Sequence, residues 1–432
     1  MLNKEKRKEI IDLINREVVP AMGCTEPAAV SLAVAKATEI LGDVPQHISV
    51  GLSSNVLKNA MGVGIPGTGM IGLPIAIALG ALIGKSEYGL EVLKDVTPQS
   101  VREGREYIAE GRIEVSLAPD TPSNLHIDVE VRRDGHTARA VISELHTNFI
   151  HVSKDGKVIF EKEAGKTSVA ENAGKAPDEV WLNLGTVWDF ATESPLEEIR
   201  FILKARDLNK AASEVGMKEA FGHSLGSTIR LSGKKLFGDG HVAHMISATS
   251  AACDARMGGA TIPVMSNSGS GNQGITATMP VVSFAEDINA SEEQLIRALT
   301  LSHLTSIYIK QSLGRLSALC GCVVASTGAS SAIVYLMGGN YDQVCSAVKN
   351  MVANLTGMIC DGAKPSCSMK ISSGVSTALM SAMLAMEGKC VTSAEGIVHD
   401  DVDVTIHNLT SIGREAMTET DLHVLEIMTN KC

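Results

Sequence analysis

The spacing of apolar residues changes once along this chain, and that change restricts the fold more than any other feature of the sequence. Between residues 111 and 162, apolar and polar side chains alternate, which is typical of half-buried strands in an antiparallel sheet. Asp-Gly pairs at 134–135 and 155–156 predict hairpin turns within this sheet. Beyond Gly174 the spacing is helical almost to the end. Strands are expected at Ile113–Val115, Leu125–Val131, Thr137–Ile142 and Val158–Phe160.

The residues before this sheet predict two helices and one more strand. Residues 4–16 have the spacing of an amphipathic helix. An Ala-rich helix is expected next, with Thr25 as its cap and Pro27 in its first turn. A strand at His47–Leu52 follows. An α+β half therefore precedes an all-α half, and we predict an α+β fold overall.

This pattern predicts two domains. The first covers residues 1–165 and has an antiparallel sheet, with its N-terminal helices docked on the second half. The second covers residues 166–432, is helical, and is expected to hold the catalytic site. A length of 432 residues allows an ample core for both.

The composition restricts the partners of the protein. The net charge of −11, without a Lys/Arg stripe that includes aromatic residues, argues against a nucleic-acid surface and favours a small-molecule substrate. Residues 61–84 contain no charge, but seven glycines and two prolines break them into a loop and a short buried helix, so no membrane span is expected. The charged start lacks the features of a secretory signal, which favours a reduced, cytosolic protein. A symmetric homodimer is the expected oligomer.

Three cysteines have surroundings suited to metal binding. Cys322 begins a small-residue helical run, and Cys360 and Cys367 bracket a turn of sequence CDGAKPSC. Three thiolates that approach one point are the usual ligands of an iron-sulfur cluster with one open iron. Zinc is less well indicated because paired Cys-x-x-Cys knuckles are missing. The alternative is that cysteines simply fill the core, and we assign this role to Cys253, Cys345 and Cys390.

The loop from Ser266 to Gly274 is the second feature that predicts a ligand. Gly269 and Gly271 would let the backbone approach an anion, and successive N–H groups could hold a carboxylate or phosphate. The side chains expected to assist are those of Asn267, Ser268 and Asn272. A flexible polar linker has a similar composition, so this alternative stays open.

Other candidates lie in the first half of the chain. Cys24 is placed at a helix N-terminus, where the dipole lowers the pKa of a thiol, so it could act as a nucleophile, a base or a substrate contact. Polar residues entering an apolar stretch suggest substrate binding, although a solvated loop would also explain them. These residues are Asn55, Lys58, Asn59 and Thr68. His146 and His223 are further acid-base candidates.

Four motifs in the same order along the chain resemble the L-cysteine desulfidase family. They are GCTEP at 23–27, SNSGSGNQG at 266–274, GCVVASTGA at 321–329, and CDGAKPSC at 360–367. The C-terminal half is also similar to the iron-sulfur L-serine dehydratases. The resemblance implies a [4Fe-4S] cluster with one open iron, held by Cys322, Cys360 and Cys367. Cys320 stands two residues before Cys322, and side chains two apart on a helix face different ways, so only one of the pair should bind.

The resemblance implies a lyase that converts L-cysteine and water to pyruvate, ammonia and hydrogen sulfide without pyridoxal phosphate. In that reaction the loop at 266–274 would hold the substrate carboxylate, and Cys24 or a histidine would be the base. Dehydration of L-serine on the same cluster is one alternative, and a non-catalytic iron-sulfur sensor or scaffold is another. Cys432, the last residue, is expected to lie in a loose tail, with a tethered inhibitor as the alternative.

Overall fold

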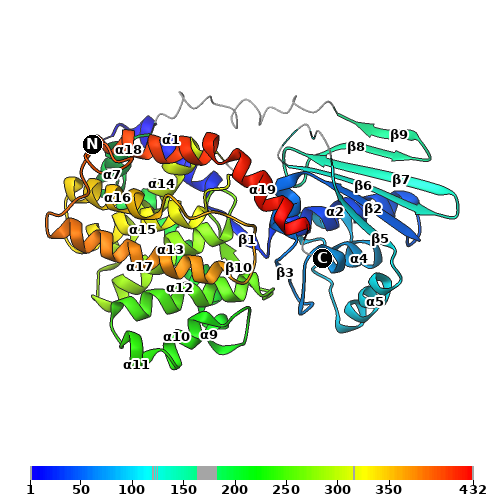
Figure 1. Ribbon diagram of the computed structural model, residues 1–432, viewed down its shortest axis with the longest axis horizontal. Helices are drawn as coiled ribbons and strands as arrows, with labels where there is room; N and C mark the ends of the chain where they lie inside the picture. The colour runs from blue at the N-terminus through cyan, green and yellow to red at the C-terminus, as the bar shows by residue number, and fades with distance from the viewer. Residues whose placement is uncertain are drawn as a thin grey trace.

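The structure is a computed structural model, and it describes residues 2–430 apart from 119–120, 122, 124, 163–181 and 315–316. Figure 1 shows two lobes side by side, one of stacked helices and one built on a sheet. The α+β fold class is confirmed. The predicted domain boundary at 165/166 lies outside the described residues, so the division at that point stays a prediction.

The sheet of the second lobe is mixed rather than purely antiparallel. Its strand order is β5-β2-β6-β7-β8-β9, and β2 pairs with β5 in parallel. The chain passes through α3, α4 and α5 between these two strands, and such a crossover is what a parallel pair requires. The strands are β2 (His47–Leu52), β5 (Ile113–Leu117), β6 (His126–Arg133), β7 (His136–Ser143), β8 (Phe149–Lys154) and β9 (Lys157–Glu161).

The predicted strands are found, and β8 is an additional strand that the alternation did not single out. Both Asp-Gly turns have the positive φ angles of a tight hairpin, with 49° and 83° at Asp134 and Gly135. Helix α2 crosses the buried face of the sheet. The remaining elements of this lobe are α2 (Thr25–Leu41), α3 (Ser54–Ala60), β3 (Gly64–Ile65), β4 (Met70–Ile71), α4 (Leu73–Leu82), η1 (Ser86–Glu91) and α5 (Pro98–Ala109).

Two local predictions in this lobe need correction. The N-cap of α2 is Cys24, and Thr25 is already the first helical residue. The buried helix expected within residues 61–84 starts from Ile71 in the prediction, at a length of about 15 residues; α4 has 10, since it starts after Gly72, which adopts a φ of 90°, and ends at Leu82. In the described part of the chain, no helix is both long and apolar enough to cross a membrane.

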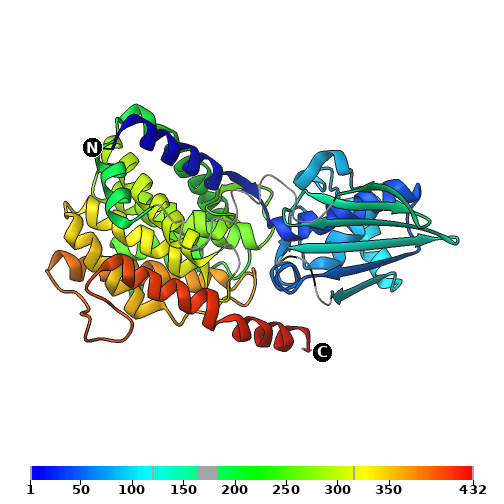
Figure 2. The same cartoon turned by 90° about the horizontal axis from the view of Figure 1, so that it is seen from above.

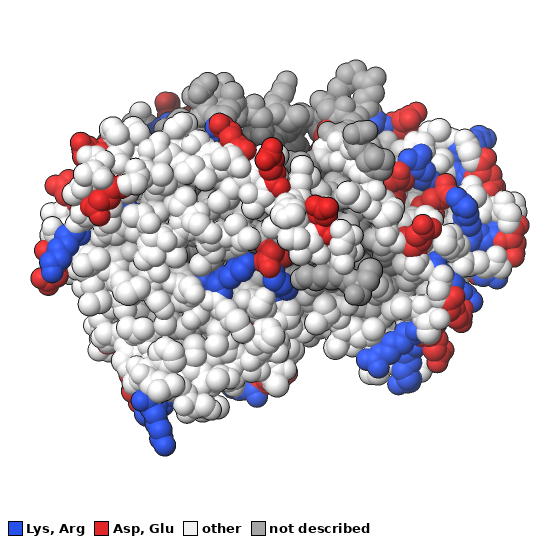
Figure 3. All heavy atoms as spheres, in the orientation of Figure 1, with Lys and Arg blue, Asp and Glu red and all other residues white. Residues whose placement is uncertain are grey.

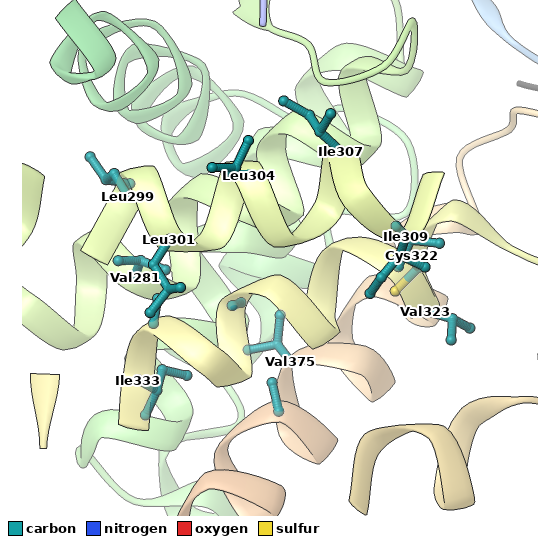
Figure 4. Close-up of a cluster of buried hydrophobic side chains, with 14 of the residues drawn as sticks. Val281, Leu299, Leu301, Leu304, Ile307, Ile309, Cys322, Val323, Ile333 and Val375 are labelled. Atoms are coloured by element: carbon teal, nitrogen blue, oxygen red, sulfur yellow. The ribbon is translucent and has the colours of Figure 1, made fainter. Parts of the chain in front are cut away.

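The helical lobe is packed around α15, whose small residues let neighbouring helices approach closely. At Gly328 a Cβ atom would lie 2.3 Å from the backbone oxygen of Ser302, so the α14–α15 contact requires glycine. Figure 4 shows the resulting core, in which Cys322 lies among aliphatic side chains. The helices are α7 (Leu184–Glu193), α8 (Leu196–Ile199), η3 (Arg200–Ile202), α9 (Leu203–Lys218), α10 (Leu225–Leu231), α11 (Lys234–Phe237), α12 (His241–Met257), α13 (Gly271–Asp287), α14 (Glu292–Leu313), α15 (Gly321–Leu336), α16 (Tyr341–Leu355), α17 (Cys367–Met386), α18 (Val402–Ser411) and η4 (Ile412–Ala416).

The two ends of the chain are exchanged between the lobes. The N-terminal end packs on the helical lobe, and the C-terminal end packs on the sheet lobe. The N-terminal arm, formed by α1 (Lys4–Glu17) and β1 (Pro20–Met22), lies on the helical lobe, where β1 pairs with β10 (Pro263–Met265). The C-terminal arm, α19 (Thr418–Thr429), extends toward the sheet lobe and buries Leu425 in its core. Figure 2 shows both arms, the first in blue and the second in red.

Candidate active site

A cavity of about 150 Å³ collects residues from both lobes. Its walls come from the starts of α2, α13, α15 and α17, from α3, α12 and α14, and from the loops between them. Charges of both signs gather at the junction of the lobes, whereas the helical lobe shows few charges on the face drawn in Figure 3. The lining residues are Cys24, Glu26, Asn55, Lys58, Asn59, Arg256, Ser268, Gly269, Ser270, Asn272, Gln273, Lys310, Ser317, Leu319, Cys320, Gly321, Cys322, Cys360, Gly362, Ala363, Cys367, Lys370 and Ile371.

One side of the cavity, the thiol wall, consists of Cys320, Cys322, Cys360 and Cys367. Two short extended segments pair with each other and hold Cys320 and Cys360 close together. The amide of Cys320 donates to the carbonyl of Met358 at 3.0 Å, and the amide of Cys360 donates to that of Ala318 at 2.6 Å. Cys322 lies in the first turn of α15, and Cys367 is the first residue of α17.

The thiols of this wall influence each other's protonation. Burial raises the pKa of Cys322 and Cys367, and it raises that of Cys320 to about 12. Neighbouring thiols raise these pKa values further, with Cys360 acting on both Cys320 and Cys367. Such mutual effects mean that a positive group would be needed to hold several of them as thiolates.

The donor set of the thiol wall fits an iron-sulfur cluster, because thiolates are the ligands of such clusters. Among the described residues, no three His, Cys, Asp or Glu side chains come close enough to hold a single metal ion. The thiols therefore border a cavity rather than converge on one point. A cluster distributes its ligands over several irons, which this arrangement suits better than it suits zinc.

Cys320 and Cys322 both belong to the cavity lining, and the expectation that only one of them binds stays a prediction. Cys320 is the N-cap of α15 and has extended backbone angles, so the helical spacing rule does not apply to it. Both side chains line the cavity. Cys253, which was predicted to fill the core, is fully buried behind this wall.

Four cationic residues, called the cationic wall, also line the cavity, and they are Lys58, Arg256, Lys310 and Lys370. Lys58 is paired with Asp421 and Lys370 with Asp361, and Lys370 lies beside the thiols. Arg256 is only 5% exposed, and its Nη1 donates to Asn272 Oδ1 at 3.1 Å. Its buried Nε has no hydrogen-bond partner within the described part of the chain. Arg256 nonetheless lines the cavity, and its positive charge at that wall favours an anionic ligand.

The predicted anion loop contributes Ser268, Gly269 and Asn272 to the lining. Asn267 lies behind them, where its Nδ2 donates to the carbonyl of His303 at 3.1 Å. Gly271 also lies behind the lining, because a Cβ there would be 2.3 Å from Arg256 Nε. These two residues shape the loop, and a direct substrate contact by either stays a prediction.

The structure places the remaining candidates as follows. Asn55, Lys58 and Asn59 of α3 line the cavity. Thr68 does not, since its Oγ1 donates to the carbonyl of Ile65 at 2.7 Å and closes the β3–β4 turn. His146, between β7 and β8, and His223, between α9 and α10, are not among the described lining residues. Cys432 lies outside the described residues.

Cys24 lines the cavity, but its expected low pKa is wrong. Burial is the largest effect on this thiol and raises its pKa well above the ordinary value, and the charge of Glu26 raises it further. Its Sγ donates to Glu26 Oε2 at 2.8 Å. The effect of the helix N-terminus is therefore outweighed, and the thiol is protonated at neutral pH.

Sequence reasoning missed several lining residues, mainly Glu26, Arg256, Lys310 and Lys370. A usable signal existed for two of them. Arg256 and Lys310 are charges near the ends of two helices, and each comes after a long stretch without Asp, Glu, Lys or Arg, over residues 242–253 and 298–309. Buried charges of this kind usually have a functional partner.

The family model described as serine dehydratase alpha chain matches residues 87–426. Over its full length the chain is 62% identical to a UPF0597 protein of Phocaeicola vulgatus, 99% of which is covered. It is 61% identical to one of Bacteroides thetaiotaomicron, with 99% of each chain covered, and 52% identical to one of Porphyromonas gingivalis, with both chains fully covered. The chain belongs to the serine dehydratase alpha chain family, and its close relatives carry the designation UPF0597.

Proposed function

We propose that the protein catalyses β-elimination of L-cysteine to pyruvate, ammonia and hydrogen sulfide, with a [4Fe-4S] cluster and without pyridoxal phosphate. The observation that carries this proposal is the combination of a thiol wall and a cationic wall in one cavity. Cys322, Cys360 and Cys367 would hold the cluster, and Cys320 is the other thiol available. When bound, the cluster supplies a Lewis acid that makes sulfide a better leaving group.

The residues of this chain would bind the substrate as a small zwitterion. The guanidinium of Arg256 would receive the α-carboxylate together with Ser268 and Asn272 of the loop. Lys58 and Lys310 increase the positive potential around that carboxylate. The cavity volume of about 150 Å³ is below the range of roughly 300–1,000 Å³ for drug-sized ligands, which favours an amino acid with a short side chain.

Dehydration of L-serine is the second candidate, and the family description favours it. The two substrates differ only in the leaving group, so the same walls would bind either one. Thiol sulfur is the softer donor and suits iron held by thiolates, which is why L-cysteine is proposed first.

The test is anaerobic purification followed by iron and acid-labile sulfide analysis, and then by steady-state assays with both amino acids. We expect about four irons and four sulfides per chain, by analogy with three-thiolate cluster sites, and a higher kcat/KM for L-cysteine. A higher value for L-serine would replace the proposed substrate. A preparation without iron and sulfide under these conditions would contradict the cluster.

A cytosolic location and a homodimer also belong to this proposal. The exposed methionines Met380 and Met383 in the C-terminal part of α17 support association of two copies. Sedimentation equilibrium would test the dimer, and a monomer at micromolar concentration would contradict it.

A further inference from the structure

The first turn of α2 places a thiol and a carboxylate in direct contact on the cavity wall. Cys24 Sγ donates to Glu26 Oε2 at 2.8 Å, and Thr25 Oγ1 donates to the same oxygen at 3.2 Å. Both Cys24 and Glu26 line the cavity. None of the described residues donates a hydrogen bond to the other oxygen, Oε1. One oxygen of the carboxylate is thus fixed, and the other is available to a ligand.

The surroundings of this pair favour proton transfer to a bound molecule. Arg256, which has the buried unpartnered Nε, lines the same cavity and acts electrostatically on Cys24. Behind Cys24 a second cavity of about 300 Å³ is lined mostly by apolar residues. The pair therefore lies between an anion site and apolar side chains. Glu26 is the one carboxylate among the described lining residues of the first cavity.

We propose that Glu26 is the catalytic base that removes the α-proton of the amino acid, and that Cys24 is a positioning residue that holds the carboxylate. This inference rests on the proposed function and reassigns the role first expected of Cys24. A substrate whose α-carboxylate binds Arg256 would place its α-carbon in the cavity, where Glu26 is the one carboxylate among the described lining residues.

The chemistry balances with water as the only co-reactant. The Cα–H bond breaks, its proton goes to Glu26 Oε1, and its electron pair forms the Cα=Cβ bond while the Cβ–S bond breaks. The sulfur leaves with the electron pair of the broken bond and takes a proton to become hydrogen sulfide. The 2-aminoacrylate that remains tautomerises to the imine, and water hydrolyses the imine to pyruvate and ammonia. The proton on Glu26 returns to the departing group or to water, which restores the carboxylate.

Cys24 is poorly suited to be the base itself. Its proton lies in a hydrogen bond to Glu26, and a thiolate at that position would place two negative charges 2.8 Å apart inside a buried wall. As a donor, however, the thiol fixes the carboxylate rotamer. A serine hydroxyl could replace it in that role, whereas an alanine could not.

The experiment compares four variants of the anaerobically purified holoenzyme. Glu26→Gln keeps the shape of the side chain and removes the base. Cys24→Ser keeps a hydrogen-bond donor to Glu26, whereas Cys24→Ala removes it. Glu39→Gln makes the same chemical change at an exposed position of α2, outside the cavity, and serves as the matched control. The measurements are kcat, KM, the iron content, and deuterium incorporation at the α-carbon of L-alanine in deuterated water. L-alanine has no leaving group, so its exchange reports proton removal alone.

For Glu26→Gln we expect kcat to fall by about 10²–10⁴-fold, as for loss of a general base, with KM and iron nearly unchanged and α-exchange lost. Cys24→Ser should keep kcat within about tenfold and Cys24→Ala should lose more, because the hydroxyl still donates to Glu26. Glu39→Gln should match the wild type.

Three results would overturn the inference. Retention of kcat and exchange in Glu26→Gln would exclude the base and leave the proposed function intact. Equal inactivation of Cys24→Ser and Cys24→Ala, with Glu26→Gln active, would return the role of base to Cys24. Absence of both elimination and exchange in an iron-replete wild type would remove the proposed function, and the role of Glu26 with it.

Discussion

The helical lobe and the sheet lobe hold their cavity residues in different ways. The thiol wall starts from helices such as α15, in which nearly every residue is buried, and its backbone is fixed by close helix contacts. The sheet lobe contributes the first turn of α2 and the short helix α3, which lie at its edge. The helical lobe therefore provides the thiols and most of the cationic side chains of the cavity, and the sheet lobe provides its carboxylate, Glu26.

The two lobes are joined by their exchanged arms. The N-terminal arm supports the anion loop directly, since the amides of Ser266 and Ser268 donate to the carbonyls of Val19 and Glu17 at 2.9 Å each. The C-terminal arm reaches α3, where Asp421 forms an ion pair with the buried Lys58. Each arm thus positions a cavity residue of the lobe on which it packs. The comparison predicts separable effects of substitutions in the two lobes.

The largest effect is expected in the thiol wall. Replacement of Cys322, Cys360 or Cys367 by Ala should abolish labile sulfide and activity together, because three thiolates are needed for the cluster. Cys390→Ala, at a half-buried site outside the cavity, is the matched control and should keep both. Iron and sulfide analysis of Cys320→Ala decides between the two neighbouring thiols. If Cys320→Ala loses the cluster and Cys322→Ala keeps it, the ligand assignment is wrong.

The next effect concerns the cationic wall. Arg256→Met should raise KM by about 10- to 100-fold, as expected for loss of a hydrogen bond to a charged group, and should leave the visible absorption of the cluster unchanged. Gly271→Ala should act in the same direction, because its Cβ would displace Arg256 Nε. Loss of the absorption in Arg256→Met would indicate a structural role instead.

A smaller effect should arise where the C-terminal arm meets the sheet lobe. Asp421→Asn leaves the 2%-exposed Lys58 without its carboxylate, which should cost about 3 kcal/mol of stability. Asp12→Asn, in the exposed Lys8–Asp12 pair, is the control and should cost less than about 1 kcal/mol. Urea unfolding measures both. Equal losses would mean that the arm contact is not a buried ion pair in solution.

The free energy of unfolding should depend on pH through a buried histidine of the helical lobe, His303 in α14. Burial lowers the pKa of His303 to about 3, and this residue accepts or donates hydrogen bonds with Asn267 and Thr278. The unfolded chain takes up a proton near pH 6.5 that the folded chain does not, so stability is full above pH 6.5 and falls as the pH drops toward 3. The expected slope from this group is about 1.4 kcal/mol per pH unit. His303→Gln should flatten the slope between pH 6 and 4 in urea unfolding, and an unchanged slope would contradict this.

The smallest effect is expected in the hairpin turn between β6 and β7, outside the cavity. Gly135 has a φ of 83° in the β6–β7 turn. Gly135→Ala should lower the free energy of unfolding by about 1 kcal/mol, because a side chain strains that conformation. Gly135→Asn should lose less, since asparagine tolerates positive φ. Activity and iron content should not change in either variant. A decrease in iron would show that the lobes are coupled more strongly than their contacts suggest.

Much of the fold could be predicted from local sequence because helix and strand spacing are written into neighbouring residues. The strand at 47–52 and the helix over 4–16 follow directly from their apolar positions. The parallel pairing of β2 with β5 could not be predicted, since it depends on how the three intervening helices cross the sheet. The cavity shows the same division. Its thiols, Gly-rich loop and GCTEP motif stand out in the sequence, but only the meeting of the two lobes shows that Arg256 and Glu26 line one cavity.

The sequence by itself determined which elements form, which residues carry thiols, and which loop can approach an anion, because these depend on residue type and short spacing. Tertiary structure alone decided that Cys24 is a protonated donor rather than a thiolate, since burial and the nearby Glu26 outweigh the helix dipole. It also decided that Cys320 faces the cavity and that Asp421 reaches Lys58, 363 residues away in the chain. Protonation and contact depend on solvent exclusion and on distances in space, and neither is encoded in the spacing of residues along a chain.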